Sequence, residues 1–194
     1  MAIIQKAMEL TDFILSIVPF PIDDAKFIAA NFQSLTLKKG EIVLQKGKVS
    51  DDYIYLEEGL MRSYLYDLDG NEVTTDIFTE KNIAFEITSF FNRTPSETFM
   101  EALTECKGLK INYEKLNELF HNKPTFREFG RAILVREFIA SKKRNYAMIN
   151  QTAEQRYQNL ITHKPEIIKY VPLKYIASYL GITDSTLSRI RAKF

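Results

Sequence analysis

The side chains best suited to binding chemistry lie near the end of the chain. Between residues 173 and 191, apolar residues recur at the fourth, eighth, tenth, fifteenth and eighteenth positions, a spacing that lets two short helices pack together. Gly181 can adopt the left-handed backbone conformation that turns the chain between them, and Thr183 can cap the second helix. This pattern predicts a helix-turn-helix, whose second helix enters the major groove of DNA. The five apolar positions are Ile176, Leu180, Ile182, Leu187 and Ile190.

The second of these helices carries polar side chains that could read bases. Arg189 can donate two hydrogen bonds to the edge of a guanine, and Asp184 can accept one from a cytosine. Ser185 and Ser188 can contact either bases or phosphates, so these four residues are the predicted base contacts. Other side chains are better placed for phosphate oxygens, which position a protein without reading sequence. These predicted phosphate contacts are Lys174, Thr183, Arg191 and Lys193.

A generic helical hairpin would satisfy part of this pattern. The alternative hypothesis is therefore a small-molecule- or partner-binding module in which a degenerate helix-turn-helix makes protein contacts. DNA binding would show a steep loss of affinity with added salt and a preference for one sequence, whereas the alternative would show neither.

The net charge of +1 is the sum of two parts of the chain whose net charges have opposite signs. Residues 1–126 carry 13 Lys and Arg against 20 Asp and Glu, a net charge of −7. Residues 127–194 carry 13 against 5, a net charge of +8. A basic final third on an acidic remainder is typical of a polyanion-binding module joined to a separate domain.

The composition argues against several kinds of site. The single cysteine, Cys106, cannot form an internal disulfide and is expected to be a buried small hydrophobe. His121 and His163 lie far apart in sequence without a cysteine nearby, which argues against zinc, haem and iron–sulfur sites. No phosphate-binding loop or nucleophile elbow occurs. We expect no metal, no cofactor and no catalytic residue.

No apolar stretch approaches the roughly 20 residues that span a bilayer, and the N-terminus does not resemble a secretory signal. These features predict a protein of the cytoplasm that does not enter membranes.

The order of the expected elements divides the chain into helical, extended and helical regions. Residues 1–33 predict short helices broken by Pro19 and Pro21. From residue 33 to 112, short alternating segments with turns at about ten-residue intervals predict an antiparallel barrel or sandwich. Asp69-Gly70 gives the clearest hairpin signal, since glycine accepts the positive φ that tight turns demand. Helices are expected again over 114–122, 124–147 and 152–162, and in a final pair that begins at Pro172.

The helix expected over 124–147 carries apolar residues on more than one side, so one domain would not cover it all. A second subunit is one partner for the remaining face, and this chain's own two domains are the other. The residues predicted to meet a second subunit are Phe129, Ile133, Val135 and Ile139.

As a whole, the chain resembles the Crp–Fnr superfamily of bacterial transcription regulators. The resemblance rests on the glycine spacing of the strand region, the long helix after it and the helix-turn-helix at the end. Its motifs are Lys39-Gly40-Glu41, Gly47, Tyr53-Ile54-Tyr55, Gly59 and Asp69-Gly70-Asn71-Glu72-Val73, with residues 153–157, 175–183 and 186–191 especially similar to the branch common in Bacteroidetes.

The resemblance implies an α+β protein in three parts. Residues 1–123 would form an effector domain, a cyclic-nucleotide-binding-like antiparallel β jelly roll with flanking helices. Residues 124–147 would form a dimerisation helix, and residues 148–194 a mostly helical DNA-binding domain. Because the chain ends at Phe194, a reduced or absent wing is expected. The implied partners are double-stranded DNA, a second copy of the chain, an unknown small-molecule effector or none, and RNA polymerase as a candidate.

One departure from the family argues against cyclic AMP as the effector. Members that bind it carry a Gly-Glu pair and an Arg that neutralises the phosphate, whereas Phe85 stands where the Gly would be and Glu97 about where the Arg would be. A carboxylate repels a phosphate. Recruitment of Arg93 instead is an alternative. The predicted effector pocket consists of Phe85, Glu86, Ile87, Glu97 and Thr98.

Overall fold

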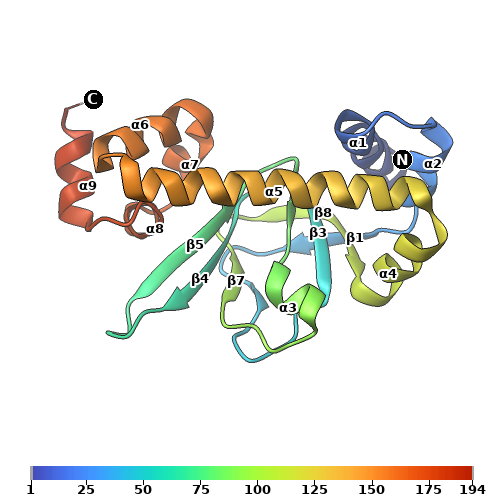
Figure 1. Ribbon diagram of the computed structural model, residues 1–194, viewed down its shortest axis with the longest axis horizontal. Helices are drawn as coiled ribbons and strands as arrows, with labels where there is room; N and C mark the ends of the chain where they lie inside the picture. Colours follow the sequence, from blue (N-terminus) through green and yellow to red (C-terminus); the bar gives the residue numbers. More distant parts are fainter. Residues whose placement is uncertain (1, 194) are drawn as a thin grey trace.

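A computed structural model describes the backbone of residues 2–193 and the side chains of residues 9–193. The outer limits of the predicted domains, Met1 and Phe194, lie outside the described residues. The fold is α+β, as the sequence predicted. Two helices precede a pair of antiparallel sheets, a long helix crosses the molecule, and a small helical domain ends the chain (Figure 1).

The N-terminal helices are α1 (Ala2–Ile17) and α2 (Ile22–Ala29), and the break between them falls at the two prolines that predicted it. Leu10, Phe13 and Ile14 on α1 are buried in the largest hydrophobic core of the chain. The ring of Phe13 lies 4.9 Å from that of Tyr55, so α1 is anchored on the sheet behind it.

Within the described residues, eight strands form two four-stranded sheets with the orders β1-β8-β3-β6 and β2-β7-β4-β5. Every strand pair is antiparallel, as the alternating segments predicted. The hairpin at Asp69-Gly70 joins β4 to β5, and Gly70 has the positive φ (+81°) that the turn requires. The strands are β1 (Gln33–Leu37), β2 (Ile42–Leu44), β3 (Asp52–Glu58), β4 (Met61–Tyr66), β5 (Glu72–Phe78), β6 (Asn82–Ala84), β7 (Phe99–Ala102) and β8 (Cys106–Asn112).

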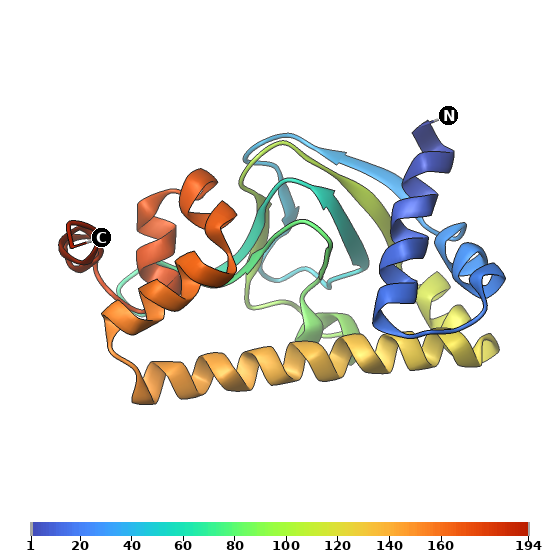
Figure 2. The ribbon, with the colours of Figure 1, turned by 90° about the horizontal axis from the view of Figure 1, so that it is seen from above.

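Helix α3 (Ile87–Asn92) lies between β6 and β7 in the chain. Helices α4 (Tyr113–Asn122) and α5 (Pro124–Asn150) follow β8. Pro124 occupies the first turn of α5, where its missing N–H sacrifices no hydrogen bond. With 27 residues, α5 extends beyond the expected end at Ala147 and is about 40 Å long. Figure 2 shows it running along one side of the molecule, from the N-terminal helices to the C-terminal domain.

The C-terminal domain contains α6 (Ala153–His163), α7 (Pro165–Tyr170), α8 (Leu173–Tyr179) and α9 (Asp184–Arg191). Thr152 and Gln155 cap α6 reciprocally. The described residues after β8 contain helices and no strand, in line with the mostly helical domain that was predicted. Its core includes three residues of the strand region, Leu60, Ile77 and Leu103, so the domain packs on the sheets.

Candidate functional site

The final helix pair has the geometry of a helix-turn-helix. Ile176, Leu187 and the other apolar positions are buried, except for Ile182, which is half-buried. Gly181 turns the chain with φ +66°, and a Cβ at this position would collide with the side chain of Met148. The hydroxyl of Thr183 accepts a hydrogen bond from the backbone N–H of Thr186 (3.3 Å), so Thr183 caps α9 as predicted.

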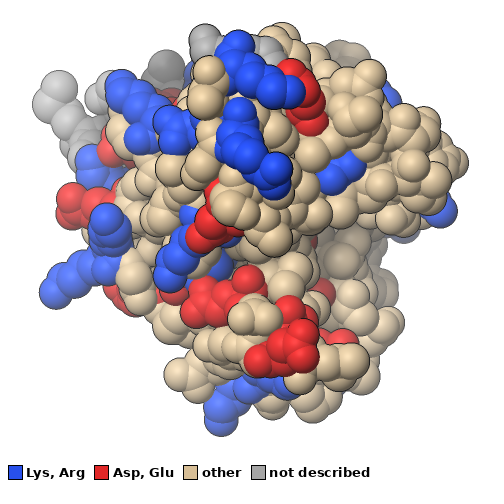
Figure 3. Space-filling view, turned by 90° about the vertical axis from the view of Figure 1, so that its left-hand side faces the viewer, with Lys and Arg blue, Asp and Glu red and all other residues tan. Residues whose placement is uncertain are grey.

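All eight predicted DNA contacts are exposed. Arg189 lies along α9, because its guanidinium donates to the Ser185 carbonyl (3.4 Å) and to the Thr186 hydroxyl (3.2 Å). Lys193 pairs with Glu154 of α6 at 3.0 Å. Figure 3 views this end of the molecule, where Lys and Arg side chains spread over the upper half and Asp and Glu side chains gather lower down. Contact of these residues with DNA stays a prediction.

A cavity of about 520 Å³ lies where the sheets, α5 and the C-terminal domain meet. Four of the five predicted pocket residues line it: Phe85, Glu86, Ile87 and Thr98. The fifth, Glu97, is exposed and is not part of the lining. Sequence reasoning missed lining residues from the earlier strands β4, β5 and β6 and from later elements. The strand residues are Ser63, Thr75, Asp76, Ile77, Phe78, Asn82 and Ile83, and the later ones are Glu137, Phe138, Ala140, Ser141 and Arg144 of α5 together with Lys164 and Tyr179.

Glu86 is committed to the helix beside the cavity. Its carboxylate accepts hydrogen bonds from the backbone N–H groups of Thr88 (3.3 Å) and Ser89 (2.6 Å), and so caps α3. The first amides of α3 therefore already hold an anionic group that belongs to the chain itself.

Arg93 is turned away from the cavity. Its guanidinium donates to the Ser50 carbonyl and to the Asp51 carboxylate, both at 2.8 Å, and stacks over the Tyr113 ring at 4.0 Å. It does not line the cavity. The structure thus gives no support to the alternative in which Arg93 replaces the missing phosphate-binding arginine.

The side of the cavity nearest the C-terminal domain is organised by Arg144 of α5. Its guanidinium donates to the Thr75 carbonyl and to the Tyr179 carbonyl (3.4 Å), and lies 4.2 Å from the centre of the Tyr179 ring. Burial raises the pKa of Tyr179, whereas the positive charge of Arg144 opposes that rise. The hydroxyl oxygen of Thr75 is buried without a hydrogen-bond partner among the described residues, and Thr75 lines the cavity.

The structure corrects the set of residues predicted to meet a second subunit. Phe129 and Ile133 are 1% and 0% exposed and belong to the chain's own core, so they offer no surface to a partner. Val135 and Ile139 lie on the other side of α5 and are 46% and 48% exposed. For these two, contact with a second subunit stays a prediction.

The sequence contains two histidines and one cysteine, so it offers few soft ligands for a metal ion. His121 and His163 each make a hydrogen bond with a backbone carbonyl of their own helix. No group of three or more His, Cys, Asp or Glu in the described part of the chain could hold a metal ion. Cys106 is buried, as predicted. No helix within residues 2–193 is long and apolar enough to cross a membrane.

Comparison with known proteins identifies a similar domain family and similar solved structures. Residues 34–123 match the family model of the cyclic nucleotide-binding domain, whereas no characterised protein matches the chain in a sequence search. FixK2 from Bradyrhizobium japonicum has a similar structure, with a TM-score of 0.70 and 15% identity over 84% of this chain and 83% of that one. A protein from Eubacterium rectale, described as a transcriptional regulator of the Crp/Fnr family, gives a TM-score of 0.68 and 15% identity over 92% and 87%.

The c-di-GMP-responsive global regulator CLP of Xanthomonas campestris is similar as well, with a TM-score of 0.66 and 17% identity over 84% of this chain and 86% of that one. At such identities the likeness concerns the fold, and the resemblance to the Bacteroidetes branch stays a prediction. Residues 34–123 therefore resemble the cyclic nucleotide-binding domain, and the chain as a whole has a fold similar to that of solved Crp/Fnr transcription regulators.

Proposed function

We propose that this protein is a homodimeric, DNA-binding transcription regulator of the Crp–Fnr type that does not respond to cyclic AMP. The observation that carries the proposal is the helix pair α8–α9, which buries its apolar positions and leaves the polar face of α9 exposed at one end of the molecule. As such a regulator it acts in the cytoplasm and is not an enzyme, with RNA polymerase as a candidate partner.

The charge of the exposed face supports binding to a polyanion. Lys174, Arg189, Arg191 and Lys193 are all exposed on or beside the helix pair. Phosphate contacts from such side chains supply affinity, and the N-terminal half of α9 supplies the base contacts. Arg189 would leave its hydrogen bonds along α9 to reach a guanine.

The exposed face of α5 supports a dimer. Val135, Ile139, Lys142, Tyr146 and Ile149 follow one another at alternating spacings of four and three residues, and all five are exposed. This heptad-like spacing, apolar apart from Lys142, suits the seam between two parallel α5 helices. Figure 2 shows that one side of α5 faces away from the other elements of residues 2–193. A two-fold axis along the seam would present two α9 helices to a near-palindromic operator.

Three features support the loss of cyclic AMP binding. Glu86 already occupies the first amides of α3, and Arg93 is paired with Asp51 on another surface. Glu97, at the position where the family carries its arginine, brings a further negative charge. A phosphate at the first turn of α3 would therefore meet carboxylates, because the guanidinium of Arg93 lies at the other end of this helix and is already paired.

An effector, if the protein uses one, would bind in the 520 Å³ cavity. The unpartnered hydroxyl of Thr75 could bond a polar group of such a molecule. Because the cavity touches the sheets, α5 and the C-terminal domain, a ligand could favour one arrangement of these parts over another.

Selection of bound sequences from a random double-stranded DNA library tests the central proposal. We expect the full-length protein to enrich a near-palindromic sequence, and its affinity for that sequence to fall steeply as salt is added. Absence of enrichment together with salt-insensitive binding would favour the alternative, a module whose helix-turn-helix contacts proteins. In a calorimetric titration with cyclic AMP, a dissociation constant in the micromolar range or below would refute the claim about the effector.

A further inference from the structure

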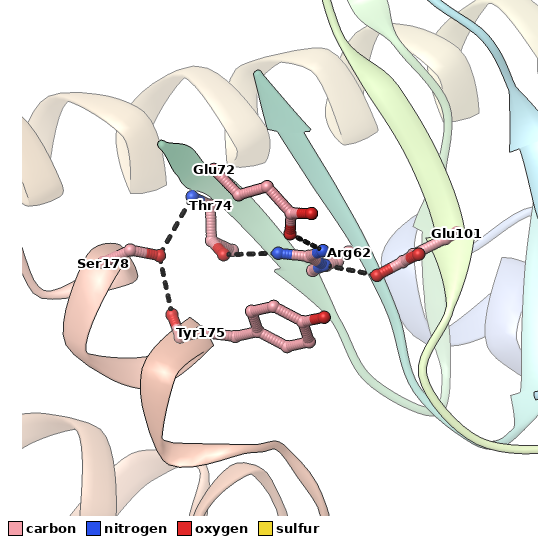
Figure 4. A network of polar contacts seen from close by, with 6 residues as sticks. All are labelled: Arg62, Glu72, Thr74, Glu101, Tyr175 and Ser178. Atoms are coloured by element: carbon pink, nitrogen blue, oxygen red, sulfur yellow. Dashed lines mark hydrogen bonds and ion pairs between the residues drawn. The ribbon is translucent and has the colours of Figure 1, made fainter. Parts of the chain in front are cut away.

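The helix-turn-helix is docked on the β4–β5 hairpin through a buried polar network. Ser178 of α8 accepts a hydrogen bond from the backbone N–H of Thr74 in β5 (3.1 Å). The side chain of Thr74 in turn accepts one from Arg62 of β4 (3.3 Å). Figure 4 shows these residues between the two elements, with the Tyr175 ring directed toward the Arg62 guanidinium.

Arg62 is the centre of this network and is only 1% exposed. Its guanidinium donates to Glu101 at 2.6 Å and to Glu72 at 2.5 Å, so its charge is balanced within the strand region. One ring contact comes from Tyr64, whose centre is 4.1 Å from the guanidinium carbon. The other comes from Tyr175 of α8, at 3.4 Å. The burial of Arg62 therefore depends in part on the presence of the helix-turn-helix.

Arg144 makes a second attachment, beside Ser178 at the C-terminal end of α8. It connects α5 to the Thr75 carbonyl in β5 and to Tyr179, the last residue of α8. Leu60 and Ile77 add apolar contacts, since both belong to the core of the C-terminal domain. The orientation of α8, and of α9 packed on it, is thus fixed by bonds to the strand region.

The docked arrangement places acidic groups against the predicted phosphate contacts. A groove of about 730 Å³ is lined on one side by Asp67 and Glu72 of the β4–β5 hairpin and on the other by Lys174, Thr183 and Asp184. Hydrogen bonds from Asn71 lower the pKa of Asp67, so this carboxylate is negative at neutral pH. A phosphate that approached Lys174 or Thr183 would meet these carboxylates across the groove.

We propose that this docking is an autoinhibitory latch, in which Tyr175 and Ser178 hold the helix-turn-helix beside the acidic hairpin and thereby weaken its binding to DNA. The inference rests on the proposed function. Release of α8 from Thr74 and Arg62 would take Lys174 and Thr183 away from Asp67 and Glu72. The apparent affinity for DNA would then rise in proportion to the released fraction of the protein.

Substitution of Tyr175 by Leu tests the latch while it retains apolar packing in the core of the C-terminal domain. We expect faster amide hydrogen exchange at Thr74, since its bond to Ser178 would break more often, and DNA binding about three- to tenfold tighter. Tyr170→Leu is the matched control, because Tyr170 is an exposed aromatic residue of the same domain outside the latch. It should leave both measurements within twofold of the wild type.

A cross-link supplies the opposite perturbation. Cysteines in place of Thr74 and Ser178, which adjoin through their hydrogen bond, would hold α8 docked when oxidised. Cys106 is 1% exposed and does not compete for oxidation. We expect the oxidised protein to bind DNA at least tenfold more weakly than the same protein after reduction.

The outcomes separate the latch from the proposed function. Equal binding by the oxidised and reduced proteins would overturn the latch and leave the regulator in place, provided that a selected sequence is still bound. Unchanged exchange at Thr74 in Tyr175→Leu would also overturn it, because Tyr175 would then not hold the docked state. If neither the wild type, Tyr175→Leu nor the reduced protein binds any DNA, the proposed function itself is wrong and the latch has nothing to inhibit.

Discussion

Two isoleucines on opposite sides of α5 allow the fold and the dimer to be perturbed separately. Ile133 is 0% exposed in the core of its own chain, whereas Ile139 is 48% exposed on the side that we assign to a second subunit. Replacement of each by alanine should affect either the fold or the dimer. Because the two positions share one helix and one chemistry, their effects on helix propensity cancel in the comparison.

The expected magnitudes follow from burial. Ile133→Ala should lower the free energy of unfolding by about 2–5 kcal/mol, the range for large-to-small changes in a packed core. About half of the Ile139 side chain is exposed and available for burial by a partner. Ile139→Ala should therefore lower the free energy of association by about 1 kcal/mol per subunit. A two-fold dimer contains the substitution twice, so its dissociation constant should rise by roughly 30-fold.

Sedimentation velocity over a range of protein concentrations measures the dimer, and urea unfolding measures the fold. Unfolding should be compared at concentrations low enough for all variants to be monomeric, since association adds apparent stability by mass action. Under these conditions Ile139→Ala should unfold within about 0.5 kcal/mol of the wild type. The reasoning is refuted if Ile139→Ala dimerises like the wild type while Ile133→Ala dissociates without loss of stability.

Three further changes test the site. Glu86→Ala removes the cap of α3 and should lower the free energy of unfolding in urea by about 1 kcal/mol. Glu97→Ala is the control and should leave this free energy unchanged, because Glu97 is exposed. Equal effects of the two substitutions would contradict the capping role of Glu86. Arg189→Ala should relax the sequence preference at one base position in a binding selection. Lys193→Ala should lower the affinity for all DNA sequences alike. Identical selectivity profiles of the two variants would show that Arg189 is not a base contact. Burial raises the pKa of Tyr179 in the folded protein, so the stability gained from its neutral phenol is complete below about pH 10 and is lost as the pH rises further. Tyr179→Phe should flatten that decline between pH 9 and 11 in urea unfolding, and an unaltered slope would show that another group causes it.

The long helix illustrates what periodicity can and cannot predict. Apolar residues around α5 predicted that it is covered on more than one side, and coverage of its exposed side by a second subunit stays a prediction, but periodicity gives no means of deciding which residues meet the chain's own core. Phe129 and Ile133 face α1 and the sheets because these elements lie on that side, a fact of tertiary packing. Val135 and Ile139 remain available by the same geometry.

The pocket and the helix-turn-helix were predictable to different degrees. The helix pair is local in sequence, so the buried positions and the Thr183 cap could be read from spacing alone. The pocket combines Phe85 and Glu86 with residues up to Tyr179, and sequence spacing does not indicate which distant elements will meet. Arg62 carried one signal that was not used, a lone cation within a strand whose other residues are largely apolar.

The position of β5 gives the docked helix-turn-helix a second consequence, for solubility. As the last strand of its sheet, β5 has a hydrogen-bonded strand neighbour on one side only. On its free side, Ser178 accepts from the Thr74 amide and Arg144 donates to the Thr75 carbonyl. When α8 leaves, the Thr74 amide loses its partner and the edge of β5 that α8 covered becomes a template for strand addition by another chain. A variant that is permanently undocked should therefore aggregate more readily in concentrated solution, and we expect bound DNA not to protect it, because the proposed base contacts lie on α9 and leave the edge of β5 open.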